Sequence, residues 1–446
     1  MIWIQLVILI SAILLGARMK GIGLGVIGMI GLVIFVFFFH MRPAEPPIDV
    51  MFIILAIVTT AATLQAAGGL DYLVGVAEKI IRKHPSQIIF IGPVVTFILA
   101  LFAGTAHIVY SILPIIAEVS AKRRIRPERP ISISVVASHM ALTGSPMSAA
   151  TAALASILGY PGAQIDIMKV AIPSCFIGVI AGAISVLKMG KELEKDPLFI
   201  EKMKDPEFEA SIDSSESQRG IQVKPGAKTA VIIFGITILL IVLVGAFPSI
   251  VPIVETGPAN LSVRANGTIT TASLIEMLTL SGAALIMILT RTSPANVVKA
   301  SLFNAMGAAI VSVFGVVWMS STFISHNQAM FQDTFGHIAK SYPWTYAIGI
   351  FSMGIFMFSQ AATTRTMMPL GLALGLSHPS LIAMFPTVQG DFVLPGYPTL
   401  LAAIQFDRTG TTRIGRFVIN HSFLRPGLIT VFVSVICGFA LSAILL

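Results

Sequence analysis

Two ionisable residues occupy matching positions in this apolar chain, each seven residues before a proline. His139 precedes Pro146, and Asp391 precedes Pro398. A histidine titrates near neutral pH, and burial raises the pKa of a carboxyl group toward that range. The two residues are therefore candidates for proton coupling, and a structural hydrogen bond or ion pair would explain them equally well.

An arginine and a further histidine lie inside long apolar runs. Arg365 stands in the run 344–376, and an arginine at the centre of a membrane helix costs about 2.5–3.5 kcal/mol to insert. We therefore expect it to face water, a carboxylate or a ligand, with a structural ion pair or snorkelling to the interface as alternatives. His107, in the run 88–117, is either a ligand contact or a satisfied polar residue.

Glycine, proline and hydroxyl residues interrupt two apolar segments at corresponding places, LTGSPMSAA (142–150) and LPGYPTLLA (394–402). Ser145 suits the N-cap of a new half-helix and Pro146 its first residue, and Pro398 takes that first place in the second segment. Each break frees N–H groups at a helix N-terminus within the membrane, where they can bind an anion. Ordinary packing or kinking of membrane helices is the alternative.

The runs 88–117 and 344–376 are too long for one crossing and too short for two, so each is predicted to form a re-entrant hairpin. Together with the breaks, the two tips place four helix termini near the membrane midplane. Each terminus favours a negative group by about 0.3–1 kcal/mol, and the sum suits a small dianion. No metal ion or cofactor is expected. The candidate substrate-binding residues are Gly104, Thr105, His107, Thr143, Gly144, Ser145, Pro146, Ser148, Ser359, Gln360, Thr363, Arg365, Gly396, Tyr397, Pro398 and Thr399.

The composition is that of an integral membrane protein. Hydrophobic residues make up 55% of the chain and charged residues 11%, with a mean hydropathy of +0.90, whereas soluble proteins carry about 25% charged residues. Arg18 and Lys20 follow the first apolar run instead of preceding it, which favours a membrane helix over a cleaved signal peptide. Both cysteines lie in apolar runs, which argues against a disulfide framework and a thiolate metal site.

A membrane-spanning helix needs about 20 apolar residues. Shorter apolar runs and the two hairpins aside, the chain offers ten candidate crossings. These are 2–16, 21–39, 50–67, 131–159, 169–187, 229–253, 272–290, 300–324, 380–405 and 424–446.

Lysine and arginine cluster in alternate loops, which predicts an orientation and explains the net charge of +8 without nucleic acid. The alternation is consistent only if the hairpin 88–117 returns to the cytoplasm and the hairpin 344–376 returns to the outer face. Both termini then lie outside. The clusters placed in the cytoplasm are 18–20, 79–83, 122–129, 188–228, 291–299 and 408–416, and the outer linkers are 41–49, 160–168, 254–271 and 325–343.

The two halves of the chain resemble each other. Residues 1–187 and 229–446 flank the hydrophilic segment 188–228, which is predicted to be a cytoplasmic linker without chemistry of its own. We predict an all-α polytopic membrane protein of two inverted repeats, each with a re-entrant hairpin and a broken helix (131–159 and 380–405), as is usual in secondary transporters. The repeat rests on three proline pairs with nearly constant offset, Pro85 and Pro343, Pro114 and Pro369, and Pro146 and Pro398.

Several motifs carry a more specific likeness. The chain resembles the Dcu family of bacterial anaerobic C4-dicarboxylate transporters from its first helix to its last. Three further motifs favour the DcuA branch over the DcuB branch, namely VKPGAKT (223–229), SPMSAA (145–150) and LPGYPTLLAA (394–403). The motifs of the family likeness are IQFDRTGTTRIGRFVINHSF (404–423), IRPERP (125–130), AGGLDYL (67–73) and SQAATTRTMMP (359–369).

The resemblance implies an inner-membrane carrier, with periplasmic termini, that takes up or exchanges fumarate, succinate, malate and L-aspartate. The wider ion-transporter superfamily implies a homodimer in which a transport domain moves like an elevator against a scaffold in the lipid bilayer. A proton- or sodium-coupled symporter and a uniporter remain alternatives to exchange. An intramembrane enzyme has little support, because HExxH and P-loop motifs are absent, and a channel would differ from a carrier by lacking counterflow.

Overall fold

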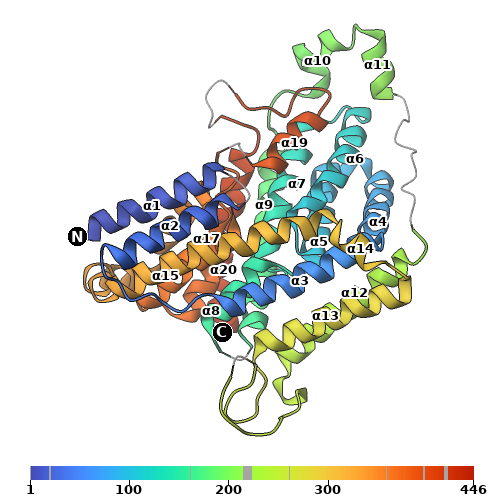
Figure 1. Ribbon diagram of the computed structural model, residues 1–446. Helices are drawn as coiled ribbons and strands as arrows, with labels where there is room; N and C mark the ends of the chain where they lie inside the picture. The colour runs from blue at the N-terminus through green and yellow to red at the C-terminus, as the bar shows by residue number, and fades with distance from the viewer. Residues whose placement is uncertain are drawn as a thin grey trace.

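The computed structural model shows an all-helical chain (Figure 1). Within the described residues the only β pairing is two isolated bridges. The predicted site residue Gly396 lies outside the described residues. The structure describes residues 2–19, 22–160, 162–213, 224–260, 262–357, 359–394, 397–415 and 420–446.

Helices follow one another closely along both halves of the chain. The first half contains α1 (Ile2–Met19), α2 (Gly23–Phe37), α3 (Ile48–Ala66), α4 (Gly69–Lys83), α5 (Ile88–Ala103), α6 (Val109–Lys122), α7 (Glu128–Met140), α8 (Ala149–Leu158) and α9 (Ala163–Val186). The segment between the halves contains α10 (Pro197–Lys202) and α11 (Pro206–Asp213). The second half contains α12 (Ala227–Ala246), α13 (Thr271–Thr290), α14 (Pro294–Val298), α15 (Ser301–Ser341), α16 (Pro343–Met357), α17 (Gln360–Ala373), α18 (His378–Met384), α19 (Pro398–Phe406) and α20 (Leu424–Leu445).

The first break is present, but the new helix starts later than predicted. After α7 and the short η3 (Ala141–Thr143), the chain is non-helical until α8 begins. Ser148 is the N-cap, and its Oγ accepts a hydrogen bond at 3.1 Å from the backbone N–H two residues on. The assignment of Ser145 and Pro146 as cap and first residue was therefore wrong. The physical reason is that Ser145 Oγ donates to the carbonyl oxygen of Leu101 on α5 at 2.6 Å, which ties the break to the neighbouring helix.

The second break and both tips also appear where the sequence predicted them. After α18 and η6 (Phe385–Val388), α19 begins at Pro398, which needs no hydrogen bond for its missing N–H. At the first tip Gly104 adopts a left-handed conformation with φ of 67° and ends α5. At the second tip Ser359 caps α17. In both α5–α9 and α16–α20, two helices joined at a tip are followed by two helices joined at a break and then by a long helix.

One predicted outer linker is helical. The run 300–324 was expected to end before a linker at 325–343, but α15 continues through 41 residues to Ser341. The segment 325–341 is polar and lacks proline, so nothing in it stops a helix that neighbouring helices support. Pro343 begins the next helix instead.

Fewer helices meet the length of a membrane crossing than the ten runs predicted. Among the described residues five qualify by length and composition, and α3 and α4, which are bent by 68°, could form a sixth. The stretch 85–103, the first arm of the predicted hairpin, is one of the five, so it is long enough to cross by itself. The five are Pro85–Ala103, Ala163–Val186, Ala227–Gly245, Ala272–Thr290 and Leu424–Leu445.

The helices pack as two groups that also contact each other, since α15 packs against α17 as well. In one group α9 packs along α20, α5 along α7, and α17 against α8. In the other α2 packs along α15, and α3 against α13 and α15. The helices α3, α4 and α15 also contact members of the first group. The broken helices and tips all belong to the first group.

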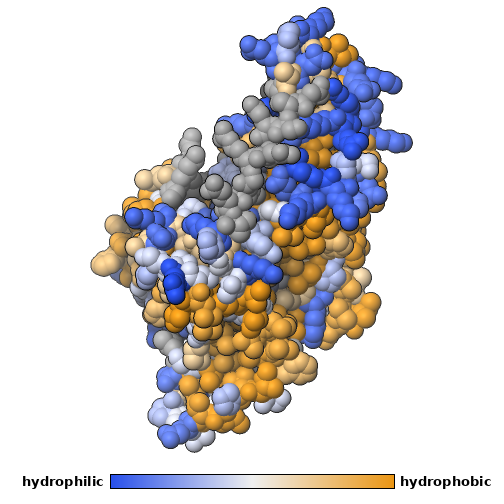
Figure 2. All heavy atoms as spheres, turned by 90° about the vertical axis from the view of Figure 1, so that its right-hand side faces the viewer, coloured by the Kyte–Doolittle hydropathy of each residue, from blue (hydrophilic) through white to orange (hydrophobic). Residues whose placement is uncertain are grey.

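The surface agrees with an integral membrane protein. Figure 2 shows hydrophilic residues gathered at the end that carries α10 and α11, and a largely hydrophobic surface further down the same face. Apolar side chains such as Ile232, Leu239 and Ile288 on α12 and α13 are more than half exposed. Such exposure is stable only against lipid or another protein.

Candidate substrate site

A buried polar cluster joins the two halves of the chain. His139, at the end of α7, lies with Nδ1 2.6 Å from Asp391 Oδ2 and with Nε2 2.8 Å from Thr399 Oγ1. Asp391 belongs to the second break, and Thr399 is the second residue of α19. The ring of Tyr397 stands edge-on to the imidazole, with centroids 4.8 Å apart. The structure thus brings four predicted site residues into one contact group.

Two glutamines complete the cluster. Gln360 Nε2, at the start of α17, donates to Gln389 Oε1 at 2.6 Å and to Asp391 Oδ2 at 3.1 Å. Gln389 Nε2 in turn donates to the carbonyl oxygen of His139 at 2.6 Å. Gln389 is fully buried and was not predicted as a site residue. Its signal in the sequence is an amide in an apolar run, two positions before Asp391.

Both ring nitrogens of His139 have hydrogen-bond partners, so the donor and acceptor roles depend on the tautomer. A neutral His139 that donates from Nδ1 to Asp391 accepts at Nε2 from the Thr399 hydroxyl, and a protonated His139 donates to it instead. Asp391 Oδ1 is buried and has no hydrogen-bond partner in the described part of the chain. An unpartnered carboxylate oxygen in a protein interior is costly, so this atom is open to a proton or to a ligand's donor.

Three of the four helix N-termini are already capped by their own side chains. Thr105 Oγ1 accepts from the N–H of His107 at 3.2 Å, and Ser148 caps α8 as described above. Ser359 Oγ accepts from the N–H of Ala362 at 3.3 Å. At α19 the side chain of the N-cap residue makes no capping hydrogen bond. The donor that this terminus offers to an anion is the N–H of Thr399, because Pro398 has no N–H and the N–H of Leu400 donates to the carbonyl oxygen of Tyr397 at 3.0 Å.

Arg365 is buried without an ion-pair partner among the described residues. Its side chain belongs to a residue that is 2% exposed, and neither Nε nor Nη2 has a hydrogen-bond partner there. The neighbouring Thr366 Oγ1 is buried and unpartnered as well. Five residues separate Arg365 from Gln360, which turns it about 140° around α17 from the cluster. The structural ion pair considered from the sequence is not seen.

Several other predicted residues have internal partners. Gly144 packs so closely on Ile172 of α9 that an added Cβ would lie 2.6 Å from a side-chain carbon. Thr143 Oγ1 donates to Met140 O at 2.7 Å, and Thr363 Oγ1 donates to a carbonyl of its own helix at 2.9 Å. The carbonyl of Pro146 accepts from Gln164 Nε2 at 3.1 Å. In this conformation these residues hold the backbone at the first break and along α17.

Thr105 and His107 lie apart from the hydrogen-bonded cluster. Both line a cavity of about 440 Å³ at the first tip. The exposed His107 ring stacks on Tyr110, with centroids 5.7 Å apart. The short helix η2 (Ala106–Ile108), which contains His107, packs against α7, the helix that ends at His139. The cavity and the cluster are thus neighbours.

Known proteins match the chain over its whole length. Residues 1–446 fit the family described as anaerobic C4-dicarboxylate membrane transporter. This chain belongs to that family. It is 40% identical to the anaerobic C4-dicarboxylate transporter DcuB of Escherichia coli O6:H1, over 99% of this chain and 98% of that one. It is 37% identical to the C4-dicarboxylate transporter DcuA of Wolinella succinogenes and 36% identical to DcuA of Escherichia coli K12, each over 100% of both chains.

These relatives are named as transporters, so this Dcu-family chain is a membrane transporter and not an enzyme. Overall identity is slightly higher to the DcuB relative than to the DcuA relatives, against the DcuA branch that three motifs had favoured. Short motifs around the breaks follow local backbone needs, whereas identity over the full length samples every helix.

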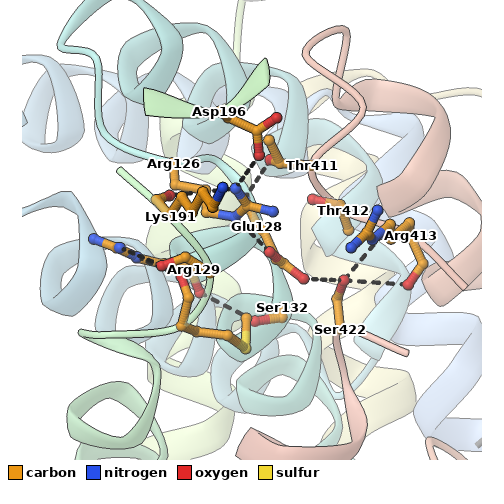
Figure 3. A network of polar contacts seen from close by, with 12 residues as sticks. Arg126, Glu128, Arg129, Ser132, Lys191, Asp196, Thr411, Thr412, Arg413 and Ser422 are labelled. Atoms are coloured by element: carbon orange, nitrogen blue, oxygen red, sulfur yellow. Dashed lines mark hydrogen bonds and ion pairs between the residues drawn. The ribbon is translucent and has the colours of Figure 1, made fainter. Parts of the chain in front are cut away.

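A second polar network holds the far ends of α7 and α19 (Figure 3). Arg126 lies just before α7, and its Nε lies 2.6 Å from Glu128 Oε2 and its Nη1 2.5 Å from Asp196 Oδ2. Ser422 Oγ donates to Glu128 Oε1 at 2.6 Å. The Dcu-family motifs at 125–130 and 404–423, used only for the resemblance, therefore meet in space.

The same network docks the segment between the halves. Arg129 Nη2 lies 2.9 Å from Glu192 Oε1, and Lys202 Nζ donates to the carbonyl of Arg408 at 3.1 Å. Although burial acts in the opposite direction, the hydrogen bonds from Arg126 and from the N–H of Leu198 lower the pKa of Asp196. The first part of the linker therefore packs against the helices that carry the cluster.

Beside α19, Asp407 organises the loop after the second broken helix. Its carboxylate accepts from Thr411 Oγ1 at 2.8 Å and from the N–H of Thr412 at 2.6 Å. It also accepts from the N–H of Thr409 at 3.0 Å. Among the described residues no group of three or more His, Cys, Asp or Glu is placed to hold a metal ion.

Proposed function

We propose that this carrier exchanges C4-dicarboxylates such as fumarate, succinate, malate and L-aspartate across a bacterial inner membrane. The substrate would lie against the second break and the second tip, at the N-terminus of α19. The observation that carries the proposal is the buried cluster of His139, Asp391, Gln360 and Thr399 beside that uncapped terminus.

Each end of the acid has a source of stabilisation. One carboxylate would accept from the N–H of Thr399 at the start of α19, and from the amide of Gln360 in exchange for one of its present contacts with Gln389 and Asp391. Arg365 would supply positive charge, because its guanidinium is buried and two of its nitrogens have no partner among the described residues. In a low-dielectric interior that charge acts over several ångströms. The names of the relatives support the substrate class, since DcuA and DcuB are C4-dicarboxylate transporters.

The unpaired groups also give a reason for exchange. An empty carrier would have to move with a buried guanidinium of which two nitrogens lack partners among the described residues, which costs several kcal/mol. A bound dicarboxylate offsets part of that cost, so the loaded form crosses faster. We propose an elevator movement in which the inverted repeats of α5–α9 and α16–α20 form the moving body of a homodimer whose termini are periplasmic. The two packed groups of helices are the basis for this division.

Purified protein in proteoliposomes tests this function. Vesicles loaded with succinate should accumulate labelled fumarate or L-aspartate transiently above equilibrium, and vesicles without internal dicarboxylate should not. Uptake that is indifferent to internal succinate would contradict exchange. A channel would show no such overshoot.

Proton-coupled symport is the second candidate, and one observation favours it. Both ring nitrogens of His139 have partners that suit its neutral and its protonated form. In that case a pH gradient alone should drive succinate uptake into empty vesicles, and His139→Gln should abolish the pH-driven part. Uptake that ignores the gradient would leave exchange without protons.

A further inference from the structure

The cavity at the first tip lies between the two groups of helices. Its volume is about 440 Å³, and its lining comes from the end of α3, the start of α4, the first tip and the start of α15. Polar lining groups include Gln65, Thr105, Ser111 and Ser301. The volume lies within the usual range of about 300–1,000 Å³ for small-molecule sites. One lining residue, His107, belongs to η2, which packs against α7, so the cavity opens beside the helix that carries His139.

One lining residue carries a fixed charge, and its sign is unexpected in an anion carrier. Asp71 is the only Asp, Glu, Lys or Arg among the residues that line this cavity. Asp71 lies in the first turn of α4, a helix that begins directly after the left-handed Gly68. Its side chain is exposed. Within the described ranges it forms no ion pair. The motif AGGLDYL therefore places a carboxylate without an ion pair in this cavity, and the nearest cation shown beside the motif, Lys224, donates its Nζ to the carbonyl oxygen of Ala66 at 3.0 Å.

That carboxylate acts differently on different C4 acids. Succinate and fumarate carry two negative charges at neutral pH and are repelled by Asp71. An acid that also carries an ammonium group has one net negative charge, and its ammonium is attracted. At a separation of several ångströms in a wet cavity, one unit of charge changes local concentration about 3- to 10-fold.

We propose that Asp71 is a specificity-determining residue of this carrier, and that it favours an amino-substituted C4-dicarboxylate over its unsubstituted dianion at the first-tip cavity. The inference rests on the proposed function. In this proposal the cavity selects between C4 acids before they reach the cluster. The second break and the second tip still bind the substrate.

A helix-stabilising role is the alternative for an acidic residue in a first turn. The chain offers a matched control for it. Asp166 lies in the first turn of α9, which likewise follows a left-handed glycine, Gly162. Asp166 is paired with Lys169 at 3.2 Å and does not line the first-tip cavity. Loss of either acid removes the same favourable interaction with a helix N-terminus, but only Asp71 can affect selection in this cavity.

The test is competition for counterflow in proteoliposomes, with L-aspartate and succinate as the probes. Asp71→Asn should lower the inhibition constant of succinate relative to that of L-aspartate by about 3- to 10-fold, and high salt should shrink the difference. Asp71→Ser should behave in the same way, and Asp71→Glu should keep the wild-type ratio. Asp166→Asn should leave the ratio unchanged even if thermal stability falls.

The proposal is overturned if both neutral variants keep the wild-type ratio, or if Asp166→Asn shifts it as much. A fall in transport of both substrates by the same factor, with a lower melting temperature, also overturns it in favour of the helix-stabilising role. Absence of counterflow in the wild-type protein is a different result, which contradicts the proposed function and not this inference alone.

Discussion

The two breaks share a sequence pattern but differ in what satisfies them. At the first break neutral side chains satisfy the backbone groups that the break leaves free. Hydrogen bonds to backbone atoms in or beside the break come from Ser145, Ser148, Thr151 and Gln164. At the second break an imidazole, a carboxylate and two amides meet each other, and the helix that follows has no side-chain cap. We infer from this difference that a broken helix is not by itself a binding site.

The first break is closely packed against the first tip in this conformation. Gly104 of the first tip packs against it so closely that a Cβ would lie 2.4 Å from the carbonyl oxygen of Met147. The second break is also tightly packed, since a Cβ on Gly390 would lie 2.4 Å from the N of Ile355. Close packing is therefore common to both breaks, and the ionisable groups are what distinguish the second.

The largest effect is expected from neutralising the carboxylate at the second break. Asp391→Asn should lower succinate counterflow about 10- to 100-fold, because it removes a charge that holds His139 and Gln360 in place. Initial rates in proteoliposomes measure the effect. Ser145→Ala at the first break is the matched control and should keep most of the rate. Equal losses in the two variants would erase the distinction between the breaks.

Arg365→Met tests whether the buried charge serves the ligand. Succinate affinity should fall about 10-fold, while the melting temperature of the empty protein should rise, because an apolar side chain replaces a buried guanidinium of which two nitrogens lack partners among the described residues. Binding by calorimetry and unfolding by fluorescence check the two effects. Arg365→Lys keeps the charge and should retain part of the affinity. A lower melting temperature with unchanged affinity would show a structural role.

A smaller effect is expected from Ser148→Ala at the first break. Loss of this cap should cost about 1 kcal/mol of stability, and the dissociation constant for succinate should stay within about 2-fold. Denaturant unfolding and equilibrium binding measure the two quantities. A large loss of affinity for succinate with unchanged stability would show that the first break binds the substrate.

The smallest effect on transport is expected from the docked linker. Protonation of Asp196 should release it, and since the pKa of this group is lowered in the folded protein, the docking contribution is complete above about pH 4 and is lost as the pH falls through the lowered value. Asp196→Asn mimics the released state at pH 7. Trypsin should cut it several-fold faster at Lys195 and Lys202, with counterflow changed less than about 2-fold. An unchanged cleavage rate would mean that Arg126 does not hold the linker.

The sequence predicted the breaks and tips because glycine, proline and capping hydroxyls act on their own neighbours in the chain. It also identified His139 and Asp391 as mates, and the structure places them in contact. It missed Gln389, since an amide acquires its role from a partner 250 residues away. The late start of α8 was missed for the same reason, because Leu101 of another helix engages Ser145.

Longer-range packing explains the other differences. A polar run such as 325–341 is compatible with a loop or a helix, and only its neighbours decide that α15 continues. The segment 188–228 was expected to be a plain linker, but Asp196 and Glu192 form ion pairs with arginines 70 and 63 positions earlier. Charge patterns in the sequence do not show which loop charges are paired.

A structure of the protein with succinate bound tests most directly whether the substrate lies at the second break and the second tip. We expect density for a four-carbon acid at the N-terminus of α19, within hydrogen-bond distance of the N–H of Thr399 and the amide of Gln360. Density confined to the first break, with the contacts of His139, Asp391 and Gln360 unchanged, would contradict it.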